Sequence, residues 1–249
     1  MIAALPMYDF EDMTAANDAF WAQVANGLRA AGVAAPAHLT RGRDLWDIWQ
    51  SPDLVLAQTC GYPFRARLAP HVGLVGTPDY AVEGCAPGYY CSLFIARATD
   101  PRSDLAAFDG TPLAYNEAMS QSGWAAPQNH AAQHGLHFPA GPLTGAHRET
   151  ALAIADGRAD LGAVDAVTWR HLQRVEPAVA GLRVVARTMP TPGLPFITAR
   201  QNPACVIFDV LAQTIAGLPP EMRAILGLRG MVAIPAAEYM AVPNPAPPA

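Results

Sequence analysis

Three successive strand-to-helix junctions between residues 113 and 169 of this 249-residue chain carry polar side chains. The junctions are Tyr115 with Asn116, the segment 144–147 that ends in His147, and Asp165. In an α/β sheet the carboxyl ends of such strands lie along one edge, so we expect the three junctions to line one cleft. The pattern therefore predicts an α/β fold with a binding site at these junctions.

The first junction continues into a segment that we call the anion seat, residues 120–123. A helix N-terminus leaves backbone N–H groups without carbonyl partners, and serine hydroxyls beside them add rotatable donors. Such a site suits a small anion, although the same residue types also serve as plain helix caps. The candidate residues are Ser120, Gln121, Ser122 and Gly123.

The amino-acid composition of the chain limits the kinds of molecule that it can bind and the chemistry that it can perform. The chain is 51% hydrophobic and 15% charged, and its mean hydropathy is +0.13, as in a globular protein with a large buried fraction. Its net charge of −5 provides no basic field, so we expect no nucleic-acid partner. All 16 basic residues are Arg, which removes Schiff-base and Walker-type lysines from consideration.

The order of elements predicts two α/β lobes. Residues 1–97 with 190–249 are expected to form lobe 1, and residues 98–189 lobe 2, with chain crossings near 97–105 and 185–192. Two connecting strands between two lobes make a hinge that can close on a ligand. A single doubly wound domain is the alternative, and residues 244–249 are expected to be a frayed tail.

The three junctions, together with residues 155–164 before Asp165, resemble a known protein family. The chain resembles the phosphate and phosphonate substrate-binding proteins of ABC transporters, which have the type II periplasmic-binding-protein fold. Weaker support comes from residues 58–62 and 191–195. The residues that carry the resemblance are Tyr115-Asn116, Ser120-Gln121-Ser122-Gly123, Gly145-Ala146-His147 and Ala155-Asp156-Gly157-Arg158-Ala159-Asp160-Leu161-Gly162-Ala163-Val164-Asp165.

The resemblance implies roles for these residues. The anion seat would hold an oxyanion, His147 would reach it from the next helix, and Asp165 would lie at the cleft wall. Lobe 1 would close the cleft with Tyr8, Thr59 and Tyr62. Gln121 departs from the family pattern, because a small hydroxyl residue is expected between the two serines.

Charge reasoning refines the expected ligand. A carboxylate beside an anion site is costly unless a cation balances it, so Asp165 favours a ligand that also carries a cationic group. A protonated His147 could supply that balance instead, and Asp165 could equally be a plain cap of the helix after it. We therefore expect a small anionic or zwitterionic ligand, similar to an aminoalkylphosphonate.

The resemblance also implies an ABC permease as partner, a monomeric chain without cofactor or metal, and no catalysis. The first residues lack the pattern of a secretory leader. The expected location is therefore periplasmic if a leader has been removed, and cytoplasmic otherwise.

Other functions remain open from the sequence. Cys60 could be drawn as a nucleophile with His147 and Asp165 in a leaderless enzyme of this fold, or the protein could be a cytoplasmic ligand sensor. His130 and His134 stand at metal-ligand spacing, but Gly135 ends the helix and a solvated helix end is expected. Cys85 and Cys91 could pair in an oxidising compartment, although free thiols are the default.

Overall fold

The sheet of unit 1 begins with β1, whose three residues alternate between the two faces of the sheet. Ala3 packs in one apolar cluster, and Ile2 and Ala4 pack in another. Both faces are covered, which explains why the strands read as continuous apolar runs. In the computed structural model, which describes residues 1–249, the sheet has the order β1 (Ile2–Ala4), β2 (Leu54–Gln58), β11 (Phe196–Ala199), β3 (Val72–Asp79) and β12 (Gly230–Val232).

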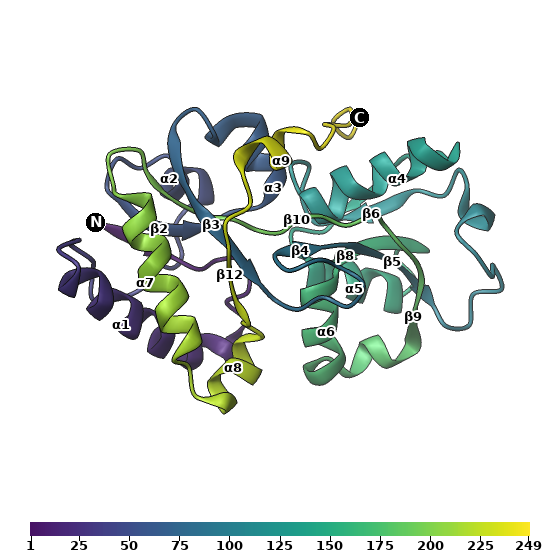
Figure 1. Ribbon diagram of the computed structural model, residues 1–249. Coiled ribbons are helices and arrows are strands. Elements are labelled where there is room, and N and C mark those ends of the chain that lie inside the picture. Colours follow the sequence, from purple (N-terminus) through teal and green to yellow (C-terminus); the bar gives the residue numbers. More distant parts are fainter. The chain divides into compact units, whose positions relative to one another are not determined.

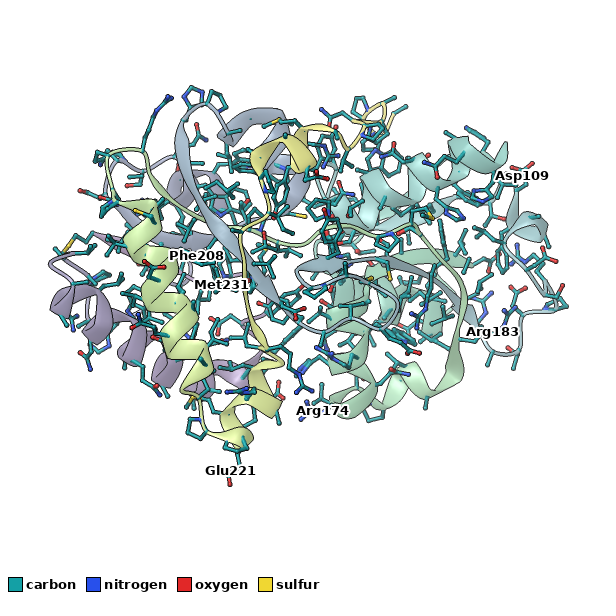
Figure 2. The ribbon with its side chains drawn as sticks, viewed as in Figure 1. Asp109, Arg174, Arg183, Phe208, Glu221 and Met231 are labelled. Carbon is teal, nitrogen blue, oxygen red and sulfur yellow. The ribbon has the colours of Figure 1, made fainter.

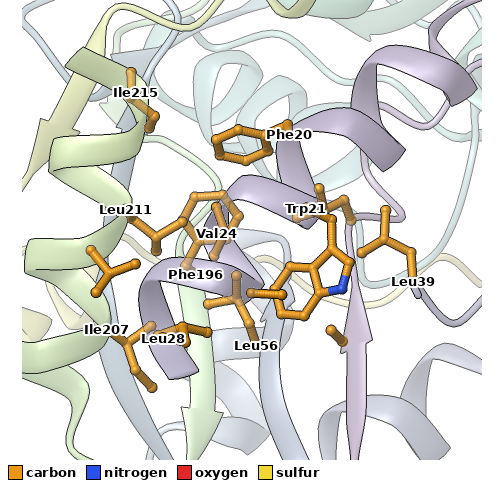
Figure 3. Packing of buried hydrophobic residues seen from close by; sticks show 14 of the residues in the cluster. Phe20, Trp21, Val24, Leu28, Leu39, Leu56, Phe196, Ile207, Leu211 and Ile215 are labelled. Atoms are coloured by element: carbon orange, nitrogen blue, oxygen red, sulfur yellow. The ribbon is translucent and has the colours of Figure 1, made fainter. Parts of the chain in front are cut away.

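Helices cover this sheet. On one face α1 (Thr14–Ala30) packs against α7 (Ala204–Ala216), and their apolar side chains meet Leu56 and Phe196 of the sheet (Figure 3). Phe208 of α7 and Met231 of β12 also lie close together (Figure 2), and a Cβ on Gly76 would come within 2.6 Å of the Phe208 ring. The remaining helices of the unit are η1 (Glu11–Met13), α2 (Leu45–Trp49), α3 (Gly61–Pro63), η2 (Phe64–Leu68), α8 (Pro220–Leu226) and α9 (Ala236–Met240).

Unit 2 has a five-stranded sheet of its own, in which β6, β7 and β8 are parallel and β5 runs antiparallel to β8. Figure 1 shows α4 on one side of this sheet and α5 and α6 on the other. The order is β7 (Ala140–Leu143), β6 (Leu113–Tyr115), β8 (Leu161–Asp165), β5 (Ser92–Arg97) and β9 (Leu182–Arg187). Its helices are η3 (Ala106–Phe108), η4 (Gln121–Ala125), α4 (Ala126–His134), α5 (His147–Ala155), α6 (Ala166–Val175) and η5 (Pro177–Gly181).

The division into units differs from the expected one at the first crossing. Unit 1 comprises residues 1–89 and 192–241, and unit 2 comprises residues 90–191 and 242–249. Residues 90–97, expected in lobe 1, lie in unit 2 because β5 pairs with β8 and β9. Two short strands at the crossings, β4 (Tyr89–Tyr90) and β10 (Thr191–Pro192), pair with each other.

The C-terminal residues also depart from the expectation of a frayed tail. Residues 242–249 belong to unit 2, where the Trp124 Nε1–H donates to the Ala246 carbonyl at 2.9 Å. The Asn129 amide donates to the Pro243 carbonyl at 2.9 Å. The chain thus passes between the units a third time, at residues 241–242. None of the helices combines the length and apolarity needed to cross a membrane.

Candidate functional site

The anion seat begins a helix, as the sequence predicts. Ser120 has an extended backbone and is the N-cap, and its Oγ accepts a hydrogen bond from the Gly123 N–H at 2.9 Å. Ser120, Gln121 and Ser122 are all at most 5% exposed. The capping role considered for Ser120 is therefore confirmed. Capping uses a lone pair of its oxygen, so the hydroxyl hydrogen can still be donated.

Asn116 lies against the anion seat, although it is not among the residues expected to bind ligand. Its Oδ1 is buried without a hydrogen-bond partner. The same oxygen lies so close to Gly123 that a Cβ there would be 1.9 Å from it. The available signal is its position, because Asn116 directly follows the carboxyl end of β6.

Ser122 and His147 meet inside unit 2. His147 is the first residue of α5, after a turn in which Gly145 has a φ of +85°. The Ser122 Oγ lies 2.9 Å from His147 Nε2. The second junction thus contacts the anion seat through this pair, and its role in ligand binding stays a prediction.

Asp165 ends β8 and caps α6. Its Oδ1 accepts the N–H groups of Val167 and Thr168, both at 2.9 Å, while its Oδ2 lies 3.6 Å from His147 Nε2. The reading of Asp165 as a helix cap is thus confirmed by its contacts. The N-terminus of α6 compensates part of its charge, so a cationic ligand group is not required for that purpose.

The electrostatics of the imidazole follow from its surroundings. Burial lowers the pKa of His147, and the Asp165 carboxylate and the Ala163 backbone partly oppose this shift. The Nδ1 atom is buried and has no hydrogen-bond partner. His147 is therefore held towards its neutral form although a carboxylate stands beside it.

The remaining residue of the seat, Gln121, has a different contact. Its Nε2 donates to the Thr191 Oγ1 at 3.5 Å, close to the point where the chain leaves unit 2. A longer side chain in place of a small hydroxyl residue thus connects the seat with β10.

The three residues expected from lobe 1 lie in unit 1. Tyr8 packs edge-on against Tyr80, with 4.9 Å between ring centroids, and lines a pocket with Gln58. Thr59 follows β2, and its buried Oγ1 has no hydrogen-bond partner. Tyr62 lies in α3, where the Arg65 guanidinium stacks on its ring at 4.7 Å.

The histidines considered for a metal site and the cysteines considered for a disulfide form neither in the structure. No group of three or more His, Cys, Asp or Glu side chains could hold a metal ion. His134 instead stacks on His130, with 4.1 Å between ring centroids, and its Nδ1 lies 2.9 Å from the His130 carbonyl. Cys85 and Cys91 do not form a disulfide.

Comparison with known proteins places these features in a family. The family model described as "ABC transporter, phosphonate, periplasmic substrate-binding protein" matches residues 50–238. The chain belongs to this family. It is therefore a solute-binding protein with the periplasmic-binding-protein fold, as the resemblance implies.

Solved structures agree with the fold of this family. PhnD1 from Prochlorococcus marinus, in complex with methylphosphonate, is 15% identical with a TM-score of 0.70, and the match covers 96% of this chain and 93% of that one. A binding-protein component of an ABC phosphonate transporter from Pseudomonas aeruginosa is 19% identical with a TM-score of 0.68, over 94% and 81% of the two chains.

A protein from Xanthomonas citri bound to ATP is 16% identical with a TM-score of 0.70, over 97% of this chain and 95% of that one. Structural neighbours of this solute-binding protein thus include proteins with chemically different ligands. No curated protein sequence matches the chain.

Proposed function

We propose that this solute-binding protein captures a small oxyanion of the phosphonate or phosphate class at the anion seat. The observation that carries the proposal is the set of neutral donors at one helix start. The Ser120 and Ser122 hydroxyls are buried there, beside backbone N–H groups that have no carbonyl partner within the helix. Buried neutral donors of this kind bind anions without a lysine or arginine.

The proposed recognition depends on the oxyanion alone. The N–H groups of α6 and the imidazole of His147 already face the Asp165 carboxylate. A cationic group on the ligand is therefore an addition and not a requirement. We expect methylphosphonate to bind, and an aminoalkylphosphonate to bind less than about tenfold more tightly, a difference of about 1.4 kcal/mol.

The second half of the proposal concerns closure and partners. We propose that unit 1 closes over the bound anion with Tyr8, Thr59 and Tyr62, and that the closed protein delivers its ligand to an ABC permease from the periplasm. The buried Thr59 Oγ1 without a partner supports a ligand contact from unit 1.

Binding without chemistry is part of the proposal. In a Ser-His-Asp triad the serine and the carboxylate meet opposite nitrogens of the imidazole. Here Ser122 and Asp165 both approach Nε2. This arrangement does not favour His147 as a general base and supports a binding role.

The test is the thermal stabilisation of the protein by methylphosphonate. At a concentration a hundredfold above Kd, the ligand should stabilise the wild-type protein by about 2.7 kcal/mol. Ser120→Ala combined with Ser122→Ala should remove this stabilisation. Ser103→Ala is the matched control, since Ser103 is exposed in unit 2. Stabilisation that persists in the double variant would contradict the proposal.

One further variant separates capping from ligand binding. Ser120→Ala also removes the N-cap, which costs about 1 kcal/mol. Aspartate is a good N-cap, so Ser120→Asp should keep the fold while its charge repels the anion. A Ser120→Asp protein that is folded but still stabilised by methylphosphonate would overturn the assignment of the seat.

A further inference from the structure

The two ring nitrogens of His147 have different surroundings: Nε2 lies close to two side chains, and Nδ1 has no hydrogen-bond partner. The Ser122 Oγ and the Asp165 Oδ2 lie 2.9 Å and 3.6 Å from Nε2, and Nδ1 is buried without a partner. The side chains of His147 and Asp165 are 14% and 4% exposed. The imidazole and the carboxylate are therefore largely shielded from hydrogen bonds with water.

This geometry selects a tautomer. An ionised carboxylate only accepts hydrogen bonds, so a lone pair on Nε2 would face the lone pairs of Asp165. A hydrogen on Nε2 removes this repulsion and can be donated to the Ser122 oxygen. The neutral ring then carries its bare lone pair on Nδ1, and the Ser122 hydroxyl hydrogen remains available to a ligand.

The charges around the seat do not balance a bound anion. The anion seat, Asn116, His147 and Asp165 contain no Lys or Arg. The neighbouring Arg148 is paired with Glu149 at 3.2 Å and with Glu176 at 2.5 Å, and its side chain is 50% exposed. With neutral His147, Asp165 leaves the site with a charge of −1 before any anion arrives.

We propose that the anion seat takes up one proton on Nδ1 of His147 when it binds an oxyanion. The inference rests on the proposed function, because it describes the same site in its ligand-bound state. Protonation gives the ring a positive charge that balances Asp165, so the incoming anion no longer meets a net negative site. Nδ1 is the ring atom left to accept the proton, since Nε2 already carries a hydrogen, and the Ala163 backbone favours the protonated ring.

The other charged groups near α5 do not supply this charge. Asp165 on β8 is the charged group that acts on the His147 pKa. Glu149 and Glu176 both pair with Arg148, and Arg97 of β5 is paired with Asp160. From η4 the ring meets Ser122, which does not titrate in this range. The titratable residues of β6 and α6 are Tyr115 on β6 and Arg170, His171 and Arg174 on α6.

Calorimetry of methylphosphonate binding in buffers of different ionisation enthalpy measures the protons taken up. Phosphonates titrate themselves, so His147→Gln is the control that retains a donor towards Ser122 but has no titrating ring. We expect the wild-type protein to take up more protons than His147→Gln, by up to one. We also expect its affinity to fall with rising pH more steeply, by up to about tenfold per pH unit.

Nitrogen NMR of the wild-type protein provides a readout that needs no variant. The Nδ1 resonance of His147 should move from the position of a bare nitrogen to that of a protonated one when methylphosphonate is added. Equal proton uptake in both proteins, or an Nδ1 that stays bare in the complex, would overturn the proton coupling while the proposed function stands. Absence of any methylphosphonate binding to the wild-type protein would instead overturn the proposed function.

Discussion

Gly123 is the residue of the anion seat with the least freedom to change. Its N–H is held by the Ser120 Oγ, and the Asn116 Oδ1 occupies the space where a side chain would begin. Glycine is required here because the Asn116 side chain lies against the backbone. A larger residue would push Asn116 and the helix start apart.

Gly123→Ala should therefore damage the seat. Overpacking of this kind costs about 1–3 kcal/mol, and the displaced backbone should also weaken methylphosphonate binding. Urea denaturation and calorimetry measure the two effects. Gly181→Ala is the matched control in unit 2, because no atom lies within 4 Å of its added Cβ. Equal stability and affinity in the two variants would contradict the role given to Asn116 and Gly123.

His147 should leave a signature in the pH dependence of the empty protein. Its folded pKa lies below the ordinary value of 6.5, so the unfolded chain binds more protons between these two values. The contribution of His147 to stability is thus complete above pH 6.5 and is lost as the pH falls towards the folded pKa. We expect the unfolding free energy of His147→Gln to fall less than that of the wild type over this window. A parallel fall in both proteins would show that His147 is not held neutral.

At the residue scale, the parts of the site that depend on local sequence are predictable. Ser120 and Asp165 cap the helices that follow them, and such caps are set within three residues. The Asn116 side chain is not predictable in this way, because its position over Gly123 depends on how β6 and η4 pack. The shared approach of Ser122 and Asp165 to Nε2 depends on three separate elements.

At the scale of elements, the α/β class is correctly predicted, but sheet membership is not. The apolar run of β5 indicates that the strand is buried, but it does not indicate to which of the two sheets the strand belongs. β5 and β11 each follow a crossing, and each joins the sheet of the unit that the chain has just entered. Because strand pairing is a long-range contact, the boundary near residue 97 could not be placed from the pattern.

The segment after β5 is ordered by an ion pair. The Arg102 Nε and Nη2 donate to the two oxygens of Asp100 at 2.9 Å and 2.6 Å, and the guanidinium stacks on Phe108 at 4.1 Å. The hydrogen bonds from Arg102 lower the pKa of Asp100 to about 2. The stability that Asp100 adds is therefore present above pH 3.8 and is lost as the pH falls towards 2.

Asp100→Asn should test this ion pair. We expect the variant to be less stable than the wild type near pH 7, by about 1 kcal/mol, since Arg102 is 28% exposed and solvent screens its side of the pair. The difference should shrink as the pH falls below 3.8 and disappear below the folded pKa. Chemical denaturation across this pH range measures it, with Asp104→Asn as an exposed control in the same segment. A difference that does not depend on pH would rule out the charge of Asp100 as its cause.

At the scale of the whole molecule, the chain passes between its two units three times. The first two passages lie at residues 89–90 and 191–192; the sequence predicts the second of them, near 185–192, but places the first later, near 97–105. The third is the C-terminal segment, for which the proline-rich sequence predicts a frayed tail. Proline prevents regular secondary structure but leaves carbonyl groups free to accept, and Trp124 and Asn129 use two of them.

Deletion of residues 242–249 should therefore weaken unit 2. Loss of two hydrogen bonds should lower the unfolding free energy by about 1–2 kcal/mol, and the emission of Trp124 should shift to the red as water reaches its ring. Fluorescence of the full and shortened proteins, each with and without Trp124→Phe, isolates the signal. An unchanged Trp124 emission after the deletion would show that the segment does not pack on unit 2.

The central claim is that the buried Ser120 and Ser122 hydroxyls bind an oxyanion. Titration calorimetry of methylphosphonate against the wild-type protein and against Ser120→Ala with Ser122→Ala tests it most directly. We expect one ligand per wild-type chain and an affinity at least about 100-fold lower in the double variant, since two donors worth about 1.5 kcal/mol each are lost. Equal affinity in the two proteins, or no binding to the wild type, would contradict the claim.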